Sequence, residues 1–528
     1  MKEWIAFLLP PATAFAGMRM GRLILGAKWE EQFGLGLRFT LGLAIGMLVF
    51  SQSVLLAALA GINASGLLAW SALIWGVVEA GLLMPGLATG LTQTKYRPAH
   101  LWLLLLVPVV YSWWVFGQLC TLEGTLEFDA NAFWVFKAKI IYLEQGKNLL
   151  KVMHDTSLAY AHIDYPMLVP GLYALDYGAL GGVDEFVNKV WPFWMVVALS
   201  LGILSLGDVW RRPHPLAPLL VVLFCFLPGT LEFIRQEGGT MPLVFYASLP
   251  ALLIAVALFR SEVLVLAAAV LALVGSATAK LEGVIYCAVW GCALLPIIWR
   301  RGWLKEIVLW KAVVVGCLCL LPYALYRFAH PITHPADNWW QEYLSAPATM
   351  LHRLPRVWFL NVFCRFFDTD FSHWSADSDG KLQWLGHWTG FGSLVNPELS
   401  VLPWLLLVLA AFTLWKKPGR GRLTVICLSL VTLGVFTALS IVSTGYLSLQ
   451  AREGIHHFGE QIVGFSGSVV GRYFYPFVTA CSLGIATIWL IDRTPRPPPS
   501  PVATAKKTGN APSAPAGRQS KRYDGQHR

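Results

Sequence analysis

The sequence predicts an all-α polytopic membrane protein. Of its 528 residues, 56% are hydrophobic and only 13% are charged, a composition that excludes a soluble globular domain. The apolar runs are long and continuous rather than alternating, which is typical of membrane helices and not of a transmembrane barrel. We therefore expect a bundle of about 11–13 transmembrane helices, with two extracytoplasmic loops that carry interfacial helices.

The first apolar segment, residues 1–26, is open to more than one interpretation. Pro10 and Pro11 interrupt it, and Arg19 and Arg22 lie near its end. It fits a first span, a half-span or a signal-anchor. It has a short apolar run and no clear small-residue cleavage site, so it does not resemble a removed signal peptide.

The later apolar runs alternate with basic loops, so each span can be given a direction. Loops rich in Lys and Arg face the cytoplasm, which places the polar loops at residues 120–166 and 329–400 outside. Residues 167–180 are too short to cross and predict a re-entrant or interfacial helix. The predicted spans are residues 41–59, 67–91, 101–119, 190–206, 216–228, 241–259, 263–277, 284–298, 307–326, 401–415, 423–447 and 473–491.

The chain divides into three parts on this interpretation. Residues 1–98 hold the N-terminal transmembrane segments, and residues 99–492 hold one larger transmembrane domain with both outer loops. Residues 493–528 predict a disordered, basic cytoplasmic tail, because their Pro-, Ala- and Ser-rich composition cannot bury a core. Short loops and this tail hold much of the net charge of +10, so we expect membrane lipids and no nucleic acid as partners.

Ionisable residues gather where the first outer loop begins. Glu127, Asp129, Lys137 and Lys139 belong to the stretch Glu-Phe-Asp-Ala-Asn-Ala-Phe-Trp-Val-Phe-Lys-Ala-Lys, just past an apolar run. Charges are costly in hydrocarbon, so such a group in a membrane protein indicates a functional site. The two lysines are two positions apart, and on a helix they face nearly opposite ways. Only one of them is therefore expected to point into a site.

A second short motif, His-Ile-Asp-Tyr-Pro with Asp164 at its centre, closes this loop. The pattern Asp-Ala-x-x-x-Trp-x-x-Lys-Ala-Lys followed by His-x-Asp-Tyr-Pro resembles the first outer loop of integral-membrane glycosyltransferases of the GT-C class. The nearest pattern is that of the bacterial branch of the protein O-mannosyltransferase and aminoarabinose lipid A transferase superfamily. The resemblance covers roughly residues 101–493 and implies a GT-C-type helical bundle.

The resemblance also implies a reaction. Enzymes of this class take a sugar from a polyprenyl-phosphate carrier, and here the acceptor would be an extracytoplasmic glycan, lipid or protein. Asp129 matches the class's catalytic carboxylate and would act as the base in an inverting transfer, with Asp164 as a second catalytic or structural carboxylate. Judged from the residues alone, either Asp would also suit a helix cap.

Two further constellations supply cations for a departing phosphate. Thr-Ala-Lys-Leu-Glu-Gly contains Lys280 and Glu282 and is similar to a Thr-Lys-x-Glu-Gly turn of the relatives, with one residue inserted. Arg472 precedes the last span, where the relatives also have an Arg, and its planar guanidinium suits bidentate phosphate binding. We assign Lys137, Lys280, Glu282, Arg472 and Glu127 to substrate binding. The alternative without a catalytic role is that Lys280 is a snorkelling membrane anchor paired with Glu282.

The sequence departs from the pattern of the relatives at one motif, and it supports no cofactor. Where the relatives have Gly-Tyr-Ala-Asp-x-Pro, this chain has Gly-Gly-Thr-Met-Pro from Gly238, so it lacks the Asp that the relatives have there. The histidines are irregularly spaced, and a divalent metal held with Asp368 or Asp370 is possible but not supported. Cys120 and Cys364 are the cysteines in outer loops; their placement would allow a disulfide, but two free thiols is the expectation.

A glycosyltransferase of the inner (plasma) membrane, with its active site on the extracytoplasmic face, is the reading that fits best. The alternative is a transporter or flippase of lipid-linked saccharides, which would need charged residues at the membrane midplane and broken helices. A non-catalytic scaffold is a third reading, but it would not need this set of carboxylates and cations. We expect Asp129, Lys280 and Arg472 to meet in one place if an enzyme is correct.

Overall fold

Nearly all of the described chain is helical. The computed structural model describes residues 2–93, 106–115, 117, 130–144, 147–153, 155, 165–207, 216–226, 239–329, 339–359, 374–376, 382–384, 397–417, 419–452 and 467–491. Within these ranges, seven helices are long and apolar enough to cross a membrane, and five more apolar helices are shorter. The prediction of an all-α, multi-pass membrane protein is confirmed, while the expected number of about 11–13 spans requires the shorter helices to cross as well.

The N-terminal helices pack through glycine faces. A Cβ added to Gly17 or Gly46 would collide with α3 or α1 backbone oxygens, and one added to Gly76 would collide with the carbonyl oxygen of Ala12. Small residues let membrane helices approach closely, so α1 belongs to the bundle as one continuous helix through Pro10 and Pro11. The elements are α1 (Lys2–Leu25), α2 (Lys28–Gln32), α3 (Leu35–Leu59) and α4 (Ser65–Gln93).

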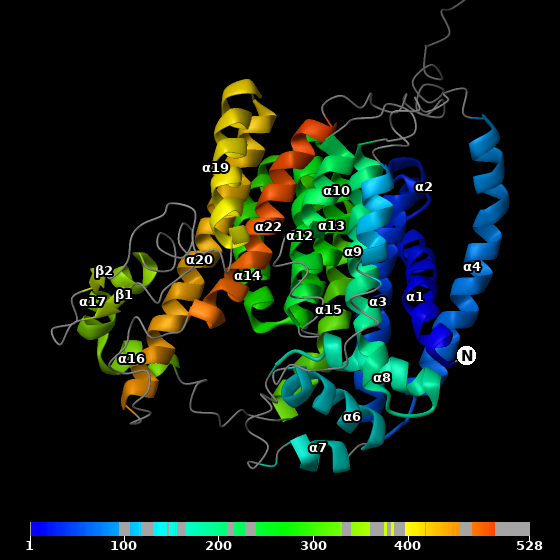
Figure 1. Cartoon of the computed structure of the whole chain (residues 1–528), viewed down its shortest axis with the longest axis horizontal. Coiled ribbons are helices and arrows are strands. Elements are labelled where there is room, and N and C mark those ends of the chain that lie inside the picture. The colour runs from blue at the N-terminus through cyan, green and yellow to red at the C-terminus, as the bar shows by residue number, and fades with distance from the viewer. Residues whose placement is uncertain are drawn as a thin grey trace, which may run out of the picture.

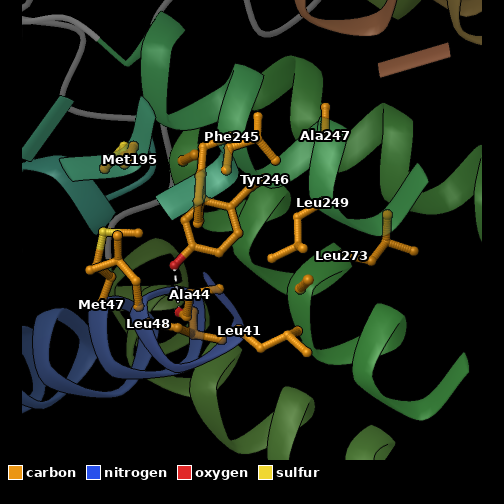
Figure 2. Close-up of a cluster of buried hydrophobic side chains, with 14 of the residues drawn as sticks. Leu41, Ala44, Met47, Leu48, Met195, Phe245, Tyr246, Ala247, Leu249 and Leu273 are labelled. Atoms are coloured by element: carbon orange, nitrogen blue, oxygen red, sulfur yellow. Dashed lines mark hydrogen bonds between the residues drawn. The ribbon is translucent and has the colours of Figure 1, made fainter. Parts of the chain in front are cut away.

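The core of the bundle lies around one central helix, α12 (Thr240–Arg260). It packs against α13 (Val263–Ala279), α22 (Gly467–Ile491) and α9 (Val190–Leu206). Its Tyr246 is fully buried, and the hydroxyl donates a 2.6 Å hydrogen bond to the carbonyl oxygen of Ala44 in α3 (Figure 2). Gly275 of α13 leaves room for the ring, since a Cβ there would collide with it. This contact ties the N-terminal helices to the central part of the chain.

The central helices follow the predicted spans closely. The helix α9 begins and ends where the sequence predicted, and the others begin or end within a few residues of the prediction. The structure has α9 (Val190–Leu206), α10 (Leu216–Phe226), α13 (Val263–Ala279), α14 (Leu281–Arg300), η4 (Trp303–Lys305) and α15 (Ile307–Ala329), with a separate apolar helix at Leu106–Val115.

Both predicted outer loops contain short helices, and the longer one also contains a small antiparallel hairpin. Figure 1 shows α16 and α17 at one edge of the molecule and α4 at the other, with α6, α7 and α8 at the lower end of the bundle. The remaining elements are η1 (Ala130–Val135), α6 (Phe136–Leu143), α7 (Lys147–Met153), α8 (Leu168–Leu180), η3 (Glu185–Lys189), α16 (Trp339–Ser345), α17 (Pro347–Phe359), β1 (Trp374–Ala376), β2 (Leu382–Trp384), α19 (Pro397–Lys416), α20 (Arg420–Arg452) and α22 (Gly467–Ile491).

The short helix α8 is buried among neighbouring helices. All of its residues except Gly178 are buried, and it packs against α1, α3, α4 and α6. The contacts are close, because a Cβ on Gly171 would lie 2.7 Å from the carbonyl oxygen of Ser51. The sequence predicted a re-entrant or an interfacial helix for this segment; the structure shows that the helix is buried by its neighbours, which neither prediction included.

Candidate functional site

The segment that carries the predicted first-loop site begins with a π-helical turn. This turn, η1, starts at Ala130 and continues directly into α6. Single π-helical turns are uncommon and are frequent at functional sites. Asp129, Glu127 and Asp164 lie outside the described residues, so the structure places only the cationic part of the predicted first-loop site.

Trp134 joins this segment to two other parts of the chain. Its indole ring is 3% exposed and lies against Gly239 at the start of α12, where an added Cβ would be 2.6 Å from the ring. The same Cβ position is 3.2 Å from the carbonyl oxygen of Ala279, the last residue of α13. The first outer loop, the start of α12 and the end of α13 therefore meet beside Lys280.

Lys137 is fully buried next to this junction. Its side chain is 0% exposed, and Nζ lies 5.3 Å from the centre of the Trp134 ring and 5.4 Å from that of Tyr165. A cation over aromatic faces is stabilised by the ring quadrupoles. Tyr165 belongs to the predicted His-Ile-Asp-Tyr-Pro motif, so the structure brings both motifs of the first outer loop to the same ammonium group.

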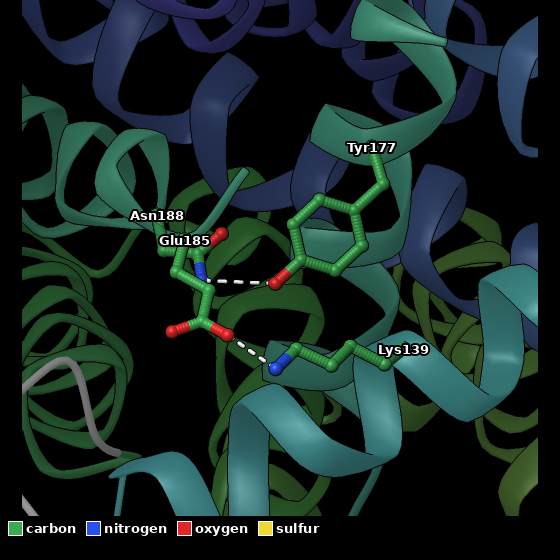
Figure 3. Close-up of polar contacts among 4 residues, drawn as sticks. All are labelled: Lys139, Tyr177, Glu185 and Asn188. Atoms are coloured by element: carbon green, nitrogen blue, oxygen red, sulfur yellow. Dashed lines mark hydrogen bonds and ion pairs between the residues drawn. The ribbon is translucent and has the colours of Figure 1, made fainter. Parts of the chain in front are cut away.

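Lys139 faces a different direction, as the helical spacing predicted. It forms an ion pair with Glu185 of η3, and about a third of each side chain is exposed (Figure 3). In the same view, Asn188 Nδ2 donates a 3.2 Å hydrogen bond to the hydroxyl of Tyr177 in α8. The first contact attaches α6 to η3, and the second attaches η3 to α8. Lys139 therefore supports the segment from its outer side, while Lys137 alone points inward.

A buried carboxyl group precedes Tyr177 in α8, and the sequence reasoning missed it. Asp176 in α8 is 0% exposed, and its Oδ2 accepts a 2.8 Å hydrogen bond from Trp191 Nε1. Its second oxygen, Oδ1, has no hydrogen-bond partner in the described part of the chain. Burial raises the pKa of Asp176 well above its usual value, and the Trp191 hydrogen bond opposes this only in part. The sequence feature that could have indicated Asp176 is a single acidic residue in the apolar run of residues 167–180.

Lys280 and Glu282 lie at a one-residue break between two helices. Lys280 has an extended backbone that separates α13 from α14, and its Nζ is 3.4 Å from Glu282 Oε1. The two side chains are only 7% and 11% exposed. Glu282 is in the first turn of α14, where the helix dipole favours a negative charge. The predicted pairing of these residues is present, but it is buried rather than at an exposed anchor.

Arg472 lies inside a helix rather than before it. The helix α22 already begins at Gly467, and the Arg472 side chain lies outside the part of the chain that the structure describes. Two contacts fix the direction of α22: the Phe477 ring is 5.0 Å from that of Tyr286, and Gly484 lies beside Ala251 of α12. Because the Tyr286 hydroxyl donates to the carbonyl oxygen of Ala247, α22 and α12 run parallel. The first turns of α22 are thus at the same end of the bundle as Gly239.

The described residues show neither a metal site nor a disulfide. In this part of the chain, no group of three or more His, Cys, Asp or Glu side chains is arranged to hold a metal ion. The seven cysteines there are free thiols. Cys120, Cys364, Asp368 and Asp370 lie outside the described residues, so the predictions made for them stay predictions.

Glu79 is a further residue that the sequence reasoning missed. It lies within the candidate membrane span Ser65–Leu83, its side chain is 9% exposed, and no hydrogen bond or ion pair joins it to the rest of the described chain. An ionisable group inside a span marks a functional position by default. The signal was a single acid within the apolar run of residues 67–91.

Comparison with known proteins adds no relative. No protein-family description, no curated protein and no solved structure matches this chain.

Proposed function

We propose that this protein is a GT-C-type glycosyltransferase that moves a sugar from a polyprenyl-phosphate-linked donor to an extracytoplasmic glycan, lipid or protein. The observation that supports it most is the junction of Trp134, Gly239 and Ala279. It places the loop that carries Lys137 next to the turn that carries Lys280. Two buried lysines then lie at one end of the bundle, and an ammonium group is suited to bind a phosphate as a point charge.

The proposed chemistry is a single displacement. The acceptor oxygen attacks the anomeric carbon from the face opposite the carrier, and its proton passes to the Asp129 carboxylate. The bond between the anomeric carbon and the phosphate oxygen breaks, and the phosphate leaves with the bonding electrons. Attack from the opposite face inverts the anomeric centre. Asp164 is the second carboxylate of this site, and Glu127 contributes to substrate binding.

The cations would act on the leaving group. Negative charge grows on the carrier phosphate as the sugar departs, so Lys137, Lys280 and Arg472 would stabilise the transition state more than the ground state. Glu282 holds Lys280 in place through the ion pair across the helix break. The buried position of Lys137 and Lys280 strengthens this effect, since their charges are poorly screened by water.

A transporter or flippase of lipid-linked saccharides is the second candidate. Glu79 favours it, because a carboxyl group inside a membrane span is common along transport paths. The helix break at Lys280 is compatible with either function. The two candidates differ in product: an enzyme forms a glycosidic bond in detergent solution, whereas a flippase needs two separated compartments.

The experiment combines profiling with purified protein. A deletion strain should accumulate the polyprenyl-phosphate sugar and lack the sugar on its acceptor, and both species are identified by mass spectrometry. The purified protein in detergent should then transfer that sugar to the unmodified acceptor. A deletion strain that keeps the modified acceptor, or purified protein that forms no product with the accumulated donor, would refute the enzyme proposal.

A further inference from the structure

The end of the bundle opposite the candidate site carries a second group of cations. The helix α14 begins beside Lys280 and ends at Arg300, and its length of about 30 Å spans a membrane core. Arg301 follows this helix directly, and Arg420 begins α20. Both guanidinium groups reach the last turn of α12, so two loops that are distant in the sequence meet there.

The hydrogen bonds of these arginines define the arrangement. Arg301 Nη2 donates to the carbonyl oxygen of Leu258 at 3.2 Å, and its Nη1 donates to Ser261 Oγ at 3.2 Å. Arg420 Nη1 donates to the carbonyl oxygen of Phe259 at 3.5 Å. Carbonyls in the last turn of a helix have no partner within the helix, and cations are favourable beside them.

These bonds leave the charges of the two arginines unbalanced. In the described part of the chain neither guanidinium forms an ion pair with a carboxylate, although Glu262 and Glu306 lie in the adjoining turns. Burial lowers the pKa of Arg301, and the nearby charge of Arg420 lowers it further. Each arginine has donors beyond the bonds named above, and a planar fork of donors fits phosphate oxygens.

Tryptophan side chains place this end of the bundle at the level of lipid headgroups. The Trp303 ring lies 4.8 Å from Arg301 Cζ. Trp299 and Trp415 are 73% and 69% exposed, and Lys416 Nζ lies 3.8 Å from the centre of the Trp415 ring. Exposed Trp next to Lys at the ends of apolar helices is typical of the membrane interface. A ligand at this position is therefore part of the bilayer.

We propose that Arg301 and Arg420 form a binding site for the phosphate of an anionic phospholipid, at the end of α12 opposite the candidate active site. The lipid phosphate bridges the two guanidinium groups and offsets their repulsion, while its acyl chains lie against the exposed apolar faces of neighbouring helices. Basic pockets between the ends of membrane helices are known to select such headgroups. This site is independent of the proposed transfer reaction.

Native mass spectrometry of the full-length protein, with phosphatidylglycerol and phosphatidylcholine as probes, tests the proposal. We expect the wild-type protein to retain phosphatidylglycerol selectively. Arg301→Gln/Arg420→Gln keeps amide donors for the α12 carbonyls but removes both charges, and it should weaken phosphatidylglycerol binding at least about tenfold. Arg422→Gln is the matched control, because Arg422 donates to the carbonyl oxygen of Leu414, and it should bind as wild type does.

Three results would overturn the proposal. The first is equal phosphatidylglycerol binding by the wild-type protein and the double variant. The second is an equal loss in Arg422→Gln, which would mean that only the general positive charge matters. The third is displacement of the lipid by inorganic phosphate at equal concentration, which would assign the site to soluble phosphates. If the double variant does not fold, Arg420→Gln alone, on the more exposed arginine, gives the same test with a smaller expected loss.

Discussion

Gly239 controls how closely the first outer loop approaches the helix break at Lys280. Its backbone angles, φ −68° and ψ −4°, are open to any residue, so Gly239→Ala adds no backbone strain. The new Cβ would lie 2.6 and 2.8 Å from two Trp134 ring atoms and 3.2 Å from the Ala279 oxygen. The rigid ring has to move away from Gly239, and with it η1 and α6.

The size of the expected effect of Gly239→Ala follows from overpacking. Inserting one carbon into a filled site costs about 1–3 kcal/mol of stability. A displacement of roughly 1 Å of a substrate-binding segment costs about 10²-fold in rate, so transfer activity should fall more steeply than stability. Thermal unfolding in detergent measures the first effect, and single-turnover transfer measures the second. Gly291→Ala is the control, since nothing lies within 4 Å of a Cβ there.

A double-mutant cycle decides whether the ring is responsible. Trp134→Phe removes the ring atoms that the new Cβ would meet, so the two substitutions together should cost less than the sum of each alone, with a coupling of about 0.5–3 kcal/mol. Additive costs, or a Gly239→Ala protein that melts and reacts like Gly291→Ala, would refute the junction described above.

Three other predictions concern the elements around the site. Gly46→Val should push α1 away from α3, because even a Cβ would collide with the Thr13 carbonyl oxygen. The melting temperature should then drop by several degrees. An unchanged melting temperature would show that α1 does not pack against α3 at Gly46. Lys139→Glu should lower the free energy of unfolding by at most about 1 kcal/mol, since the ion pair is partly exposed. Adding Glu185→Lys should restore that stability. A double variant that is no more stable than the single one would show that the ion pair does not support α6. The raised pKa of Asp176 means that the folded protein keeps a proton that the unfolded chain releases above pH of about 4. The contribution of Asp176 to stability is full below that pH and falls as pH rises toward the folded-state pKa. A plot of melting temperature against pH should therefore slope downward in this range, and Asp176→Asn should remove that part of the slope. An identical slope in the variant would contradict the raised pKa of Asp176.

Much of the helix pattern could be predicted from the sequence, because the apolar run of a membrane-spanning helix has to be long enough to cross the membrane core. The helix α9 has the predicted bounds, whereas α20 extends past its predicted span to Arg452. Lipid sets where a span is apolar, but backbone hydrogen bonds set where the helix ends, so a helix can continue past its apolar run as α20 does. For the same reason Arg472 lies inside α22 and not before it.

The site was only partly predictable. Helical spacing was enough to separate the directions of Lys137 and Lys139. The contact of Trp134 with Gly239 joins positions far apart in the chain, and no local pattern indicates it. Glu79 and Asp176 were visible as single acids within apolar runs, but their burial depends on neighbouring helices. The carboxylates assigned to catalysis, Asp129 among them, stay predictions from the resemblance.

Single-turnover sugar transfer by the purified Asp129→Asn protein in nanodiscs tests the proposed enzyme most directly. The substitution preserves size and removes the base, so the rate should fall by about 10²- to 10⁴-fold while melting temperature and membrane insertion stay as in wild type. Glu144→Gln changes the carboxylate of the residue that caps the end of α6, about two helical turns from Lys137, and should transfer at the wild-type rate. A wild-type rate in Asp129→Asn would contradict the account.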